Sequence, residues 1–320
     1  MRVIIAGGSG KIGQVLAQAL HHKGHEVVVL SRSPSAAPWR MVGWDGATLG
    51  RWAEEFEGAD AVINLAGQSV NCRYTPHNRK IITDSRVKST KVIGEAILRS
   101  WSPPGVWLQA STATIYAHRY DAANDEMTGI MGGAEPNVPE AWRFSIDVAT
   151  AWENALKASP TPNTRRVAMR TAIVMHPGAG SPFDMLLRLV RFGFGGQAGD
   201  GKQYVSWIHE HDFVRAVEWL IGHEELEGPV NIASPNPLPN AEFMRLLREA
   251  WGIPYGCPQT ELMLEVGACL LGSETELILK SRRVIPARLL GSGFEFAFPR
   301  WADAAKEICQ RVETMSRAAA

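Results

Sequence analysis

Residues 2–13 of the chain read RVIIAGGSGKIG, an apolar run followed by glycines at positions 7, 10 and 13. The apolar run predicts a short buried strand, and the spacing of apolar residues from Lys11 to Lys23 predicts a helix. At such a junction the first glycine allows a tight turn, the second lets the backbone approach a pyrophosphate, and the third lets the helix pack on the strand. The free amide groups at the helix start would then face the phosphates. The pattern favours a dinucleotide-binding loop over a plain glycine turn, and the residues assigned to it are Gly7, Gly8, Ser9, Gly10, Lys11, Ile12 and Gly13.

Strand and helix signals alternate along the chain after this loop. Apolar runs predict strands at residues 25–30, 60–66, 106–110 and 166–175, and helical spacing predicts helices at 76–100 and 140–158. This order implies a parallel sheet with helices on both faces. We therefore predict an α/β protein: a doubly wound parallel-sheet Rossmann fold with a smaller C-terminal α/β domain.

The second half of the chain is less regular, and it sets the predicted domain boundaries. Residues 1–175, with a return segment near 205–235, form the predicted nucleotide-binding Rossmann domain. Residues 176–204 and 236–320 form the predicted C-terminal, substrate-side domain. The further elements expected are strands at 204–209 and 228–232 and helices at 181–192, 212–221, 240–251, 259–271 and 299–315.

The composition excludes several classes of protein. The 320 residues carry 33 Lys and Arg against 33 Asp and Glu, so the net charge gives no bulk attraction to nucleic acid or to an anionic membrane. No apolar run approaches the roughly 20 residues of a membrane span, and the apolar start ends at Gly7, too early for a secretory signal.

Four scattered cysteines without a CxxC motif indicate reduced thiols and a cytoplasmic protein. The pair His209 and His211 lacks a completing Cys or carboxylate pattern, so we expect no metal.

The second predicted strand ends in Ser31-Arg32-Ser33, and this ending bears on the choice of cofactor. A site that selects NAD has Asp or Glu here, where the carboxylate hydrogen-bonds the ribose 2′-hydroxyl. No carboxylate stands at this position, whereas Arg32 offers a planar cation suited to a 2′-phosphate and Ser31 offers a hydroxyl. We therefore expect NADP(H) rather than NAD, the alternative being an ordinary surface arginine at a strand end.

Several motifs resemble those of the short-chain dehydrogenase/reductase superfamily, in its extended, epimerase-like branch. Residues 64–67 (NLAG) resemble its NxAG turn, and residues 111–116 (STATIY) resemble its serine-bearing strand. A narrower resemblance, to an atypical epimerase-like group with its own C-terminal module, covers nearly the whole chain. It rests on collinear motifs at residues 84–86, 152–153, 193–196, 206–209, 283–286 and 293–299. The resemblance implies NADP(H) binding, and the positions that it assigns to the cofactor are Ser31, Arg32, Leu65, Ala66 and Arg86. We also assign Gly67, the last residue of the NxAG-like turn, to the cofactor site.

The superfamily uses a Tyr-x-x-x-Lys pair on a helix, and this pair is missing here. The lysine lowers the pKa of the tyrosine, which passes a proton to or from the substrate oxygen, and residues i and i+4 share one helix face. Aligning the helix through Glu153 places Ser145 at the tyrosine position and Ala149 at the lysine position. The narrower group shares this gap.

Other groups must therefore act if the site is catalytic. Ser111 or Thr112 would hold a substrate oxygen: Ser111 matches the strand serine of the narrower group, and Thr112 aligns better with the catalytic hydroxyl of the wider superfamily. Tyr116 or His209 would supply a proton. Both have structural alternatives, because Tyr116 would pack beside the site and His209 would anchor the turn before the helix at 212–221.

These observations predict an NADP(H)-binding, epimerase-like oxidoreductase that acts on a small-molecule substrate. The alternative is a non-catalytic, NADPH-binding regulator that reports redox state to a protein partner, or a protein whose C-terminal module is the working surface. The missing pair favours the regulator. The apolar residues between Phe183 and Phe194, which precede a glycine-rich turn, would wall a substrate pocket and favour the enzyme, the alternative being plain core. No nucleic-acid or membrane partner is expected.

Overall fold

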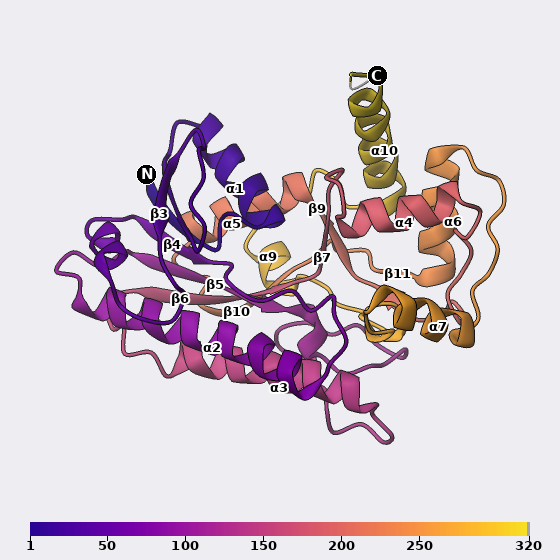
Figure 1. Cartoon of the computed structure of the whole chain (residues 1–320), viewed down its shortest axis with the longest axis horizontal. Helices are drawn as coiled ribbons and strands as arrows, with labels where there is room; N and C mark the ends of the chain where they lie inside the picture. The colour runs from indigo at the N-terminus through magenta and orange to yellow at the C-terminus, as the bar shows by residue number, and fades with distance from the viewer. Residues whose placement is uncertain (319–320) are drawn as a thin grey trace.

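A parallel sheet of seven strands forms the centre of the structure, in the order β10-β6-β5-β4-β1-β2-β3 (Figure 1). The computed structural model describes residues 1–318, apart from the side chains of residues 270, 271 and 277. Every neighbouring pair in this sheet is parallel. The strands are β1 (Arg2–Ala6), β2 (Glu26–Ser31), β3 (Arg40–Gly43), β4 (Ala61–Asn64), β5 (Val106–Thr112), β6 (Arg165–Thr171) and β10 (Gly228–Ile232).

Helices cover both faces of the sheet, which confirms the predicted doubly wound Rossmann fold. Figure 1 shows α1 (Lys11–His22) and α5 (Glu210–Gly222) on one face and α2 (Pro76–Arg99) and α3 (Glu140–Lys157) on the other. Successive residues of a strand point to opposite faces, and β1 feeds both layers. Val3 and Ile5 join the core under α1 and α5, whereas Ile4 and Ala6 join the core under α2 and α3. Burial on both faces explains why the strands are continuous apolar runs.

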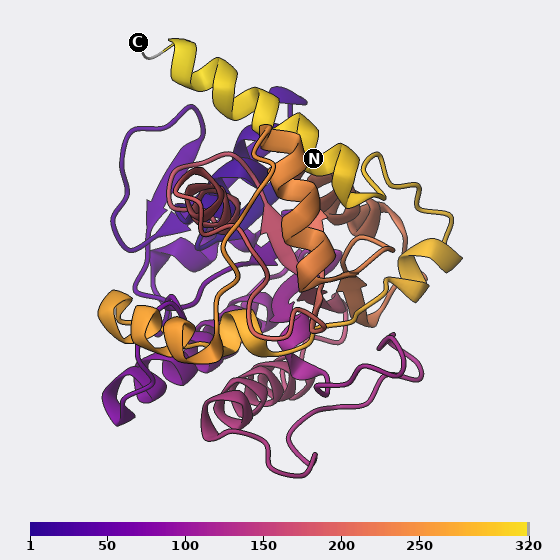
Figure 2. The same ribbon diagram turned by 90° about the vertical axis from the view of Figure 1, so that its right-hand side faces the viewer.

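A third hydrophobic core lies beside the sheet. It is built by α4 (Pro182–Arg191), α6 (Asn240–Trp251) and α10 (Trp301–Ala318), with α10 packed along α6 (Figure 2). Trp301 stacks on Phe243 with 4.0 Å between ring centroids, and Trp207 lies 5.0 Å from Trp301. Trp207 is therefore a core residue of this part of the molecule.

Two predicted strands each divide into two. The run at 166–175 forms β6 and β7 (Ile173–Met175), because Ala172 still bonds to Ile232 of β10 whereas Ile173 turns to Ser206. β7 then pairs in parallel with β9 (Trp207–His209). The run at 204–209 divides into β9 and β8 (Tyr204–Val205), which pairs antiparallel with β11 (Leu238–Pro239).

The last third of the chain returns to the Rossmann core. After α7 (Glu261–Leu271), the short helices α8 (Glu276–Leu279) and α9 (Ala287–Gly291) follow, and neither of these two has a signal in the sequence analysis. Leu289 and Phe294 pack into the core under α1 and α5. The 3-10 helices η1 (Arg51–Phe56) and η2 (Ala113–Ile115) complete the described elements.

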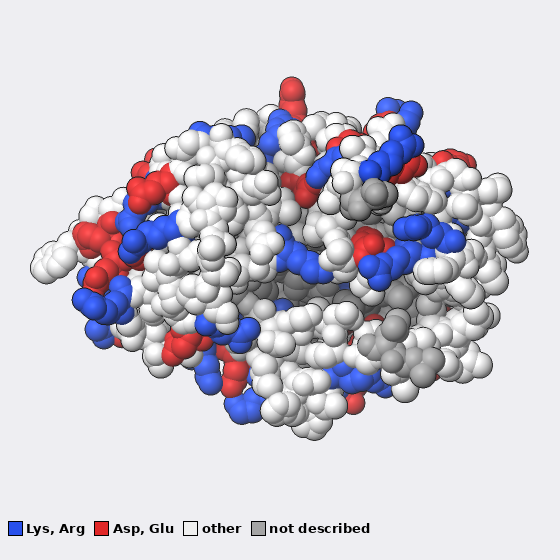
Figure 3. Space-filling view, turned by 45° about the horizontal axis from the view of Figure 1, so that its top comes forward, with Lys and Arg blue, Asp and Glu red and all other residues white. Residues whose placement is uncertain are grey.

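Acidic and basic side chains are interspersed over the face drawn in Figure 3, where basic side chains border a hollow near the middle. No helix in the described part of the chain is both long enough and apolar enough to cross a lipid bilayer.

Candidate functional site

The glycine loop between β1 and α1 is shaped by close backbone contacts. Gly7 has φ +76°, and a Cβ on it would lie 2.8 Å from the Cα of Ala66. A Cβ on Gly13 would lie 2.5 Å from the Cα of Gly8, so α1 packs directly on the loop. A Cβ on Gly10, by contrast, would meet only the carbonyl oxygen of Gly7, at 3.4 Å. The surface over Gly10 is therefore open to a ligand.

The start of α1 offers amide groups to that open surface. Gly10 caps the helix without a side chain, and the first turn holds no acidic residue, so the first backbone N–H groups have no partner within the helix. The hydroxyls of Ser9 and Ser31 lie 3.0 Å apart and tie the loop to the end of β2. The Nζ of Lys11 donates to the carbonyl of Ala179 at 2.7 Å. This cradle fits a pyrophosphate.

The end of β2 presents one uncommitted cation. Ser31 is buried, and its Oγ accepts from the amide of Ser33 at 3.1 Å. Arg32 is exposed, and it makes no hydrogen bond or ion pair with any residue that the structure describes. The next carboxylate along the chain, Asp45, accepts from the backbone amides of Ala47 and Thr48. The guanidinium of Arg32 is thus free to bind a phosphate.

The turn after β4 is fixed by a buried amide. The Nδ2 of Asn64 donates to Gln109 at 2.9 Å, and its Oδ1 accepts from the amide of Ala66 at 3.0 Å. The amide of Leu65 bonds to the carbonyl of Ala6 at 2.8 Å. Leu65, Ala66 and Gly67 therefore lie directly beside the glycine loop.

Arg86 of α2 is a second cation at this edge of the sheet. A Cβ on Gly67 would lie 3.2 Å from its Cζ, and the guanidinium lies over the ring of Trp152, 5.0 Å from the centroid. It donates to the carbonyls of Gln68 and Ile82 at 3.0 and 3.1 Å. Among the described residues no carboxylate pairs with it, and burial lowers its pKa to about 10. An anionic ligand would neutralise this charge.

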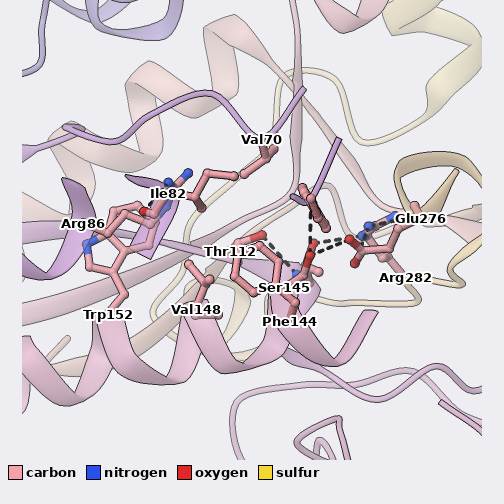
Figure 4. A pocket seen from close by; sticks show the side chains of 13 residues that line it. Val70, Ile82, Arg86, Thr112, Phe144, Ser145, Val148, Trp152, Glu276 and Arg282 are labelled. Atoms are coloured by element: carbon pink, nitrogen blue, oxygen red, sulfur yellow. Dashed lines mark hydrogen bonds and ion pairs between the residues drawn. The ribbon is translucent and has the colours of Figure 1, made fainter. Parts of the chain in front are cut away.

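A recess of about 110 Å³ opens between α2, α3 and the end of β5 (Figure 4). Apolar side chains such as Val70, Ile82 and Val148 line its middle, with Arg86 and Trp152 at one end in Figure 4. The polar residues at the other end are Tyr74, Ser145, Glu276 and Arg282, with Thr112 at the end of β5 and Thr114 in η2 nearby.

The polar end is a chain of hydrogen bonds that joins three parts of the sequence. The Oγ of Ser145 donates to the Oε2 of Glu276 at 2.5 Å and lies 3.4 Å from the hydroxyl of Tyr74. Glu276 is buried and pairs through Oε1 with Arg282 at 3.4 Å. Burial, and then the charge of Glu276, raise the pKa of Tyr74 to about 12. The phenol is thereby held in its protonated form.

The structure separates the two candidate hydroxyls of β5. Thr112 lines the recess, and its Oγ1 accepts from the amide of Thr114 at 3.1 Å. Ser111 is not among the lining residues. Its Oγ donates to Glu153 at 2.6 Å, and Glu153 forms an ion pair with Arg170 at 2.8 Å. Ser111 thus serves a buried ion pair.

The two candidate proton donors also lie outside the recess lining. The hydroxyl of Tyr116 donates to Asn231 at 2.9 Å and accepts from Arg170. His209 is the N-cap of α5, where its Nδ1 accepts from the amide of His211 at 3.0 Å. Its Nε2 therefore carries the proton and donates to Glu307 at 2.8 Å. His209 anchors this turn, as the structural alternative to a catalytic role predicted.

Sequence reasoning missed Tyr74, Glu276 and Arg282 as site residues. Tyr74 directly precedes Thr75, which caps α2, and this position indicates only a helix start. Glu276 lies in the short helix α8, and Arg282 lies in the loop after it. No local spacing connects them with Ser145.

Comparison with known proteins places this arrangement in a family. The model of the NAD dependent epimerase/dehydratase family matches residues 3–139, and that of a domain of unknown function (DUF1731) matches residues 261–308. The epimerase family protein SDR39U1 of Homo sapiens is 31% identical over 311 residues, which cover 96% of this chain and 99% of the human protein. The chain belongs to the epimerase family. The resemblance described from the sequence motifs is thereby confirmed.

Two solved structures extend the comparison for this epimerase family protein. The crystal structure of human SDR39U1 (isoform2) with NADPH has a TM-score of 0.83 and 29% identity, and covers 97% of this chain and 99% of that chain. The nucleoside-diphosphate sugar epimerase from Corynebacterium glutamicum has a TM-score of 0.74 and 26% identity, and covers 98% of this chain and 61% of that chain. No group of three or more His, Cys, Asp or Glu in the described residues could hold a metal ion.

Proposed function

We propose that the protein is an NADP(H)-binding, epimerase-like oxidoreductase of the extended short-chain dehydrogenase type. The cradle between Gly7 and Gly13 would hold the pyrophosphate, and Arg32 would bind the 2′-phosphate of the adenosine ribose. The NADPH in the crystal structure of human SDR39U1 supports this cofactor. Bound NADPH would supply a hydride to a substrate carbonyl.

One observation carries the proposal. The recess and the glycine loop lie at the same edge of the sheet, because β1, β2, β4 and β5 are parallel and end together there. Ligands of doubly wound folds bind in the crevice outside the carboxyl ends of the strands. A nucleotide anchored at α1 would therefore extend toward Thr112 and the recess.

The recess sets the substrate requirements. Its apolar middle would take a carbon skeleton, and Thr112 would direct a hydroxyl at a carbonyl or alcohol oxygen. Ser145 and Ala149 both line it, at the positions where the superfamily has tyrosine and lysine. Because neither side chain supplies the usual proton chemistry, an acid from another element is needed. The substrate class proposed is a small carbonyl compound or its alcohol.

Cofactor binding is tested first, by titrating the purified protein with NADPH and NADH while following tryptophan fluorescence. Trp152 lies in the recess and makes binding visible. We expect NADPH to bind more tightly than NADH. Equal affinity for both would contradict the assignment of Arg32 to the 2′-phosphate. If neither bound, the proposal that the protein binds NADP(H) would be wrong.

Turnover is tested next, by mixing the NADPH complex with carbonyl compounds and nucleotide sugars and following NADPH oxidation. We expect at least one class of carbonyl compound to be reduced. Tight NADPH binding without turnover of any of them would leave a regulator in place of an enzyme.

A further inference from the structure

The recess lies beside the two positions of helix α3 at which the superfamily has its catalytic tyrosine and lysine. Ser145 and Ala149 are one turn apart on α3, and both face the recess. A tyrosine and a lysine at these positions would project phenol and ammonium groups into this space. The recess thus holds the volume that the two larger side chains would fill, and a side chain from another element reaches into it.

That side chain is Tyr74, which is held in place on all sides. Its amide donates to Glu274 at 2.8 Å, and its carbonyl accepts from the Nε of Arg79 at 2.7 Å. Its ring packs edge-on against Phe144 with 4.8 Å between centroids, and the residue is only 7% exposed. The phenol therefore enters the recess from the loop before α2 in one fixed orientation.

The hydrogen bonds at the phenol have a defined direction. An ionised carboxylate only accepts, so the single proton of the Ser145 hydroxyl is committed to Glu276. The lone pairs of the same oxygen then face the hydroxyl of Tyr74, 3.4 Å away. The chain runs from Tyr74 through Ser145 to Glu276, and it ends at a buried carboxylate paired with Arg282.

We propose that Tyr74 supplies the proton that α3 does not provide, that Glu276 orients Ser145, and that Ser145 positions the phenol and returns a proton to it. This inference rests on the proposed function. In a reduction, the carbonyl carbon accepts a hydride from NADPH, the π electrons of the C=O bond move to oxygen, and that oxygen takes the proton of Tyr74. The products are an alcohol, NADP+ and a phenolate. The phenolate recovers its proton through the Ser145 hydroxyl, which passes one proton on as it takes another from a hydronium ion of the solvent, so that the reaction consumes one proton of the solution.

The charges around Tyr74 favour this direction of transfer. Burial, Glu276 and Glu274 raise the pKa of the phenol, to about 12, whereas the hydrogen bond between Tyr74 and Ser145 and the charge of Arg282 lower it. Arg86 is a further cation that interacts with the phenol. Such a phenol is protonated at neutral pH and still a stronger acid than an alcohol. It therefore serves reduction, and it serves poorly as a base for alcohol oxidation.

The first test needs no substrate. Tyrosines labelled with ¹³C at Cζ give five resonances, and the one missing from Tyr74→Phe belongs to Tyr74. Replacing NADPH by NADP+ puts a positive charge on the nicotinamide ring, so the resonance of Tyr74 must move while that of exposed Tyr255 stays. An unmoved Tyr74 resonance would overturn the proposal whatever the substrate screen gives.

The second test uses any carbonyl compound that the wild type reduces. Tyr74→Phe should lower kcat by about 10²- to 10⁴-fold with unchanged NADPH affinity and melting temperature, and the matched control Tyr255→Phe should not change kcat. Ser145→Ala should lower kcat by a smaller factor, and Ser145→Thr, which keeps the hydroxyl, should restore it. A Tyr74→Phe variant with the kcat of the wild type would refute the acid role of Tyr74 and leave the proposed function standing. A wild type that reduces no carbonyl would refute the proposed function and, with it, the acid role.

Discussion

The Oγ of Ser145 lies 2.5 Å from the Oε2 of Glu276, although the two residues are 131 positions apart. The contact joins α3 of the Rossmann part to α8 of the C-terminal segment, within the region that matches the domain of unknown function. Arg282, which pairs with Glu276, makes a second contact between these two parts, because its Nε donates to the Oγ1 of Thr114 at 2.9 Å. The C-terminal segment therefore builds one wall of the recess, and the Rossmann part alone would leave it open.

Arg32→Ala should weaken the binding of NADPH much more than the binding of NADH. The substitution removes a charge-assisted contact worth about 1.5–3 kcal/mol, which weakens NADPH binding roughly 10- to 100-fold. NADH lacks the 2′-phosphate, so its affinity should hardly change. Fluorescence titration measures both, and Arg51→Ala, at an arginine whose side chain is 98% exposed on η1, is the control. Equal weakening of NADPH and NADH would assign Arg32 another role.

Gly13→Ala should damage both the fold and the cradle. The new Cβ would lie 2.5 Å from the Cα of Gly8, so α1 must move away from the loop. Overpacking of this kind costs about 1–3 kcal/mol, and the displaced amide groups should weaken NADPH binding. The control is Gly267→Ala in α7, where a Cβ meets nothing within 4 Å. Thermal melting and NADPH titration of both variants check this, and a Gly13→Ala protein with normal binding would contradict the close packing.

The cofactor half of the site could be predicted because its signals are local. The strand, the three glycines and the helix lie within residues 2–22, and the ending at Arg32 follows one strand later. Burial on both faces makes β1, β2 and β4 continuous apolar runs, which are recognisable without a structure. The parallel sheet with helices on both faces then follows from the alternation of strand and helix.

The recess could not be predicted, because its polar groups come from three separate elements. Tyr74, Ser145 and Glu276 lie in a loop, in α3 and in α8, and no spacing rule connects a loop residue with a four-residue helix in a distant segment. Short elements such as β3 show too few periods of hydrophobicity to be recognised. The sequence also could not show which of the two neighbouring hydroxyls, Ser111 or Thr112, faces the recess. The structure shows that only Thr112 lines it.

Ser111→Ala should therefore affect mainly stability, and Thr112→Val mainly turnover. Ser111 donates to Glu153, so its loss should cost about 1–3 kcal/mol of stability and leave turnover unchanged. Thr112 lines the recess, so removing its hydroxyl should lower kcat by about 10²-fold if it holds the substrate oxygen, with about 1 kcal/mol lost from the cap on Thr114. Urea unfolding and steady-state kinetics on both variants check the pair. A larger loss of kcat in Ser111→Ala would reverse the assignment.

Protonation of buried His209 should destabilise the fold as the pH falls. Burial lowers its pKa below the usual value of 6.5, although Glu307 and Asp212 oppose this and Arg311 reinforces it. The unfolded chain thus binds the proton at about pH 6.5 while the folded chain does not, so stability is complete above that pH and is lost as the pH falls toward the folded value.

Melting temperatures at about pH 7.5 and about pH 5.5 measure this loss in the wild type. His209→Asn removes the titrating ring and keeps an N-cap oxygen for the amide of His211, so the drop in melting temperature between the two pH values should become smaller. His118 and His176, whose pKa values burial also lowers, retain part of the drop, whereas Glu126 and Glu210, whose pKa values burial raises, act in the opposite sense. His22→Asn at an exposed position is the control. An identical drop in His209→Asn and the wild type would show that His209 does not carry the pH dependence.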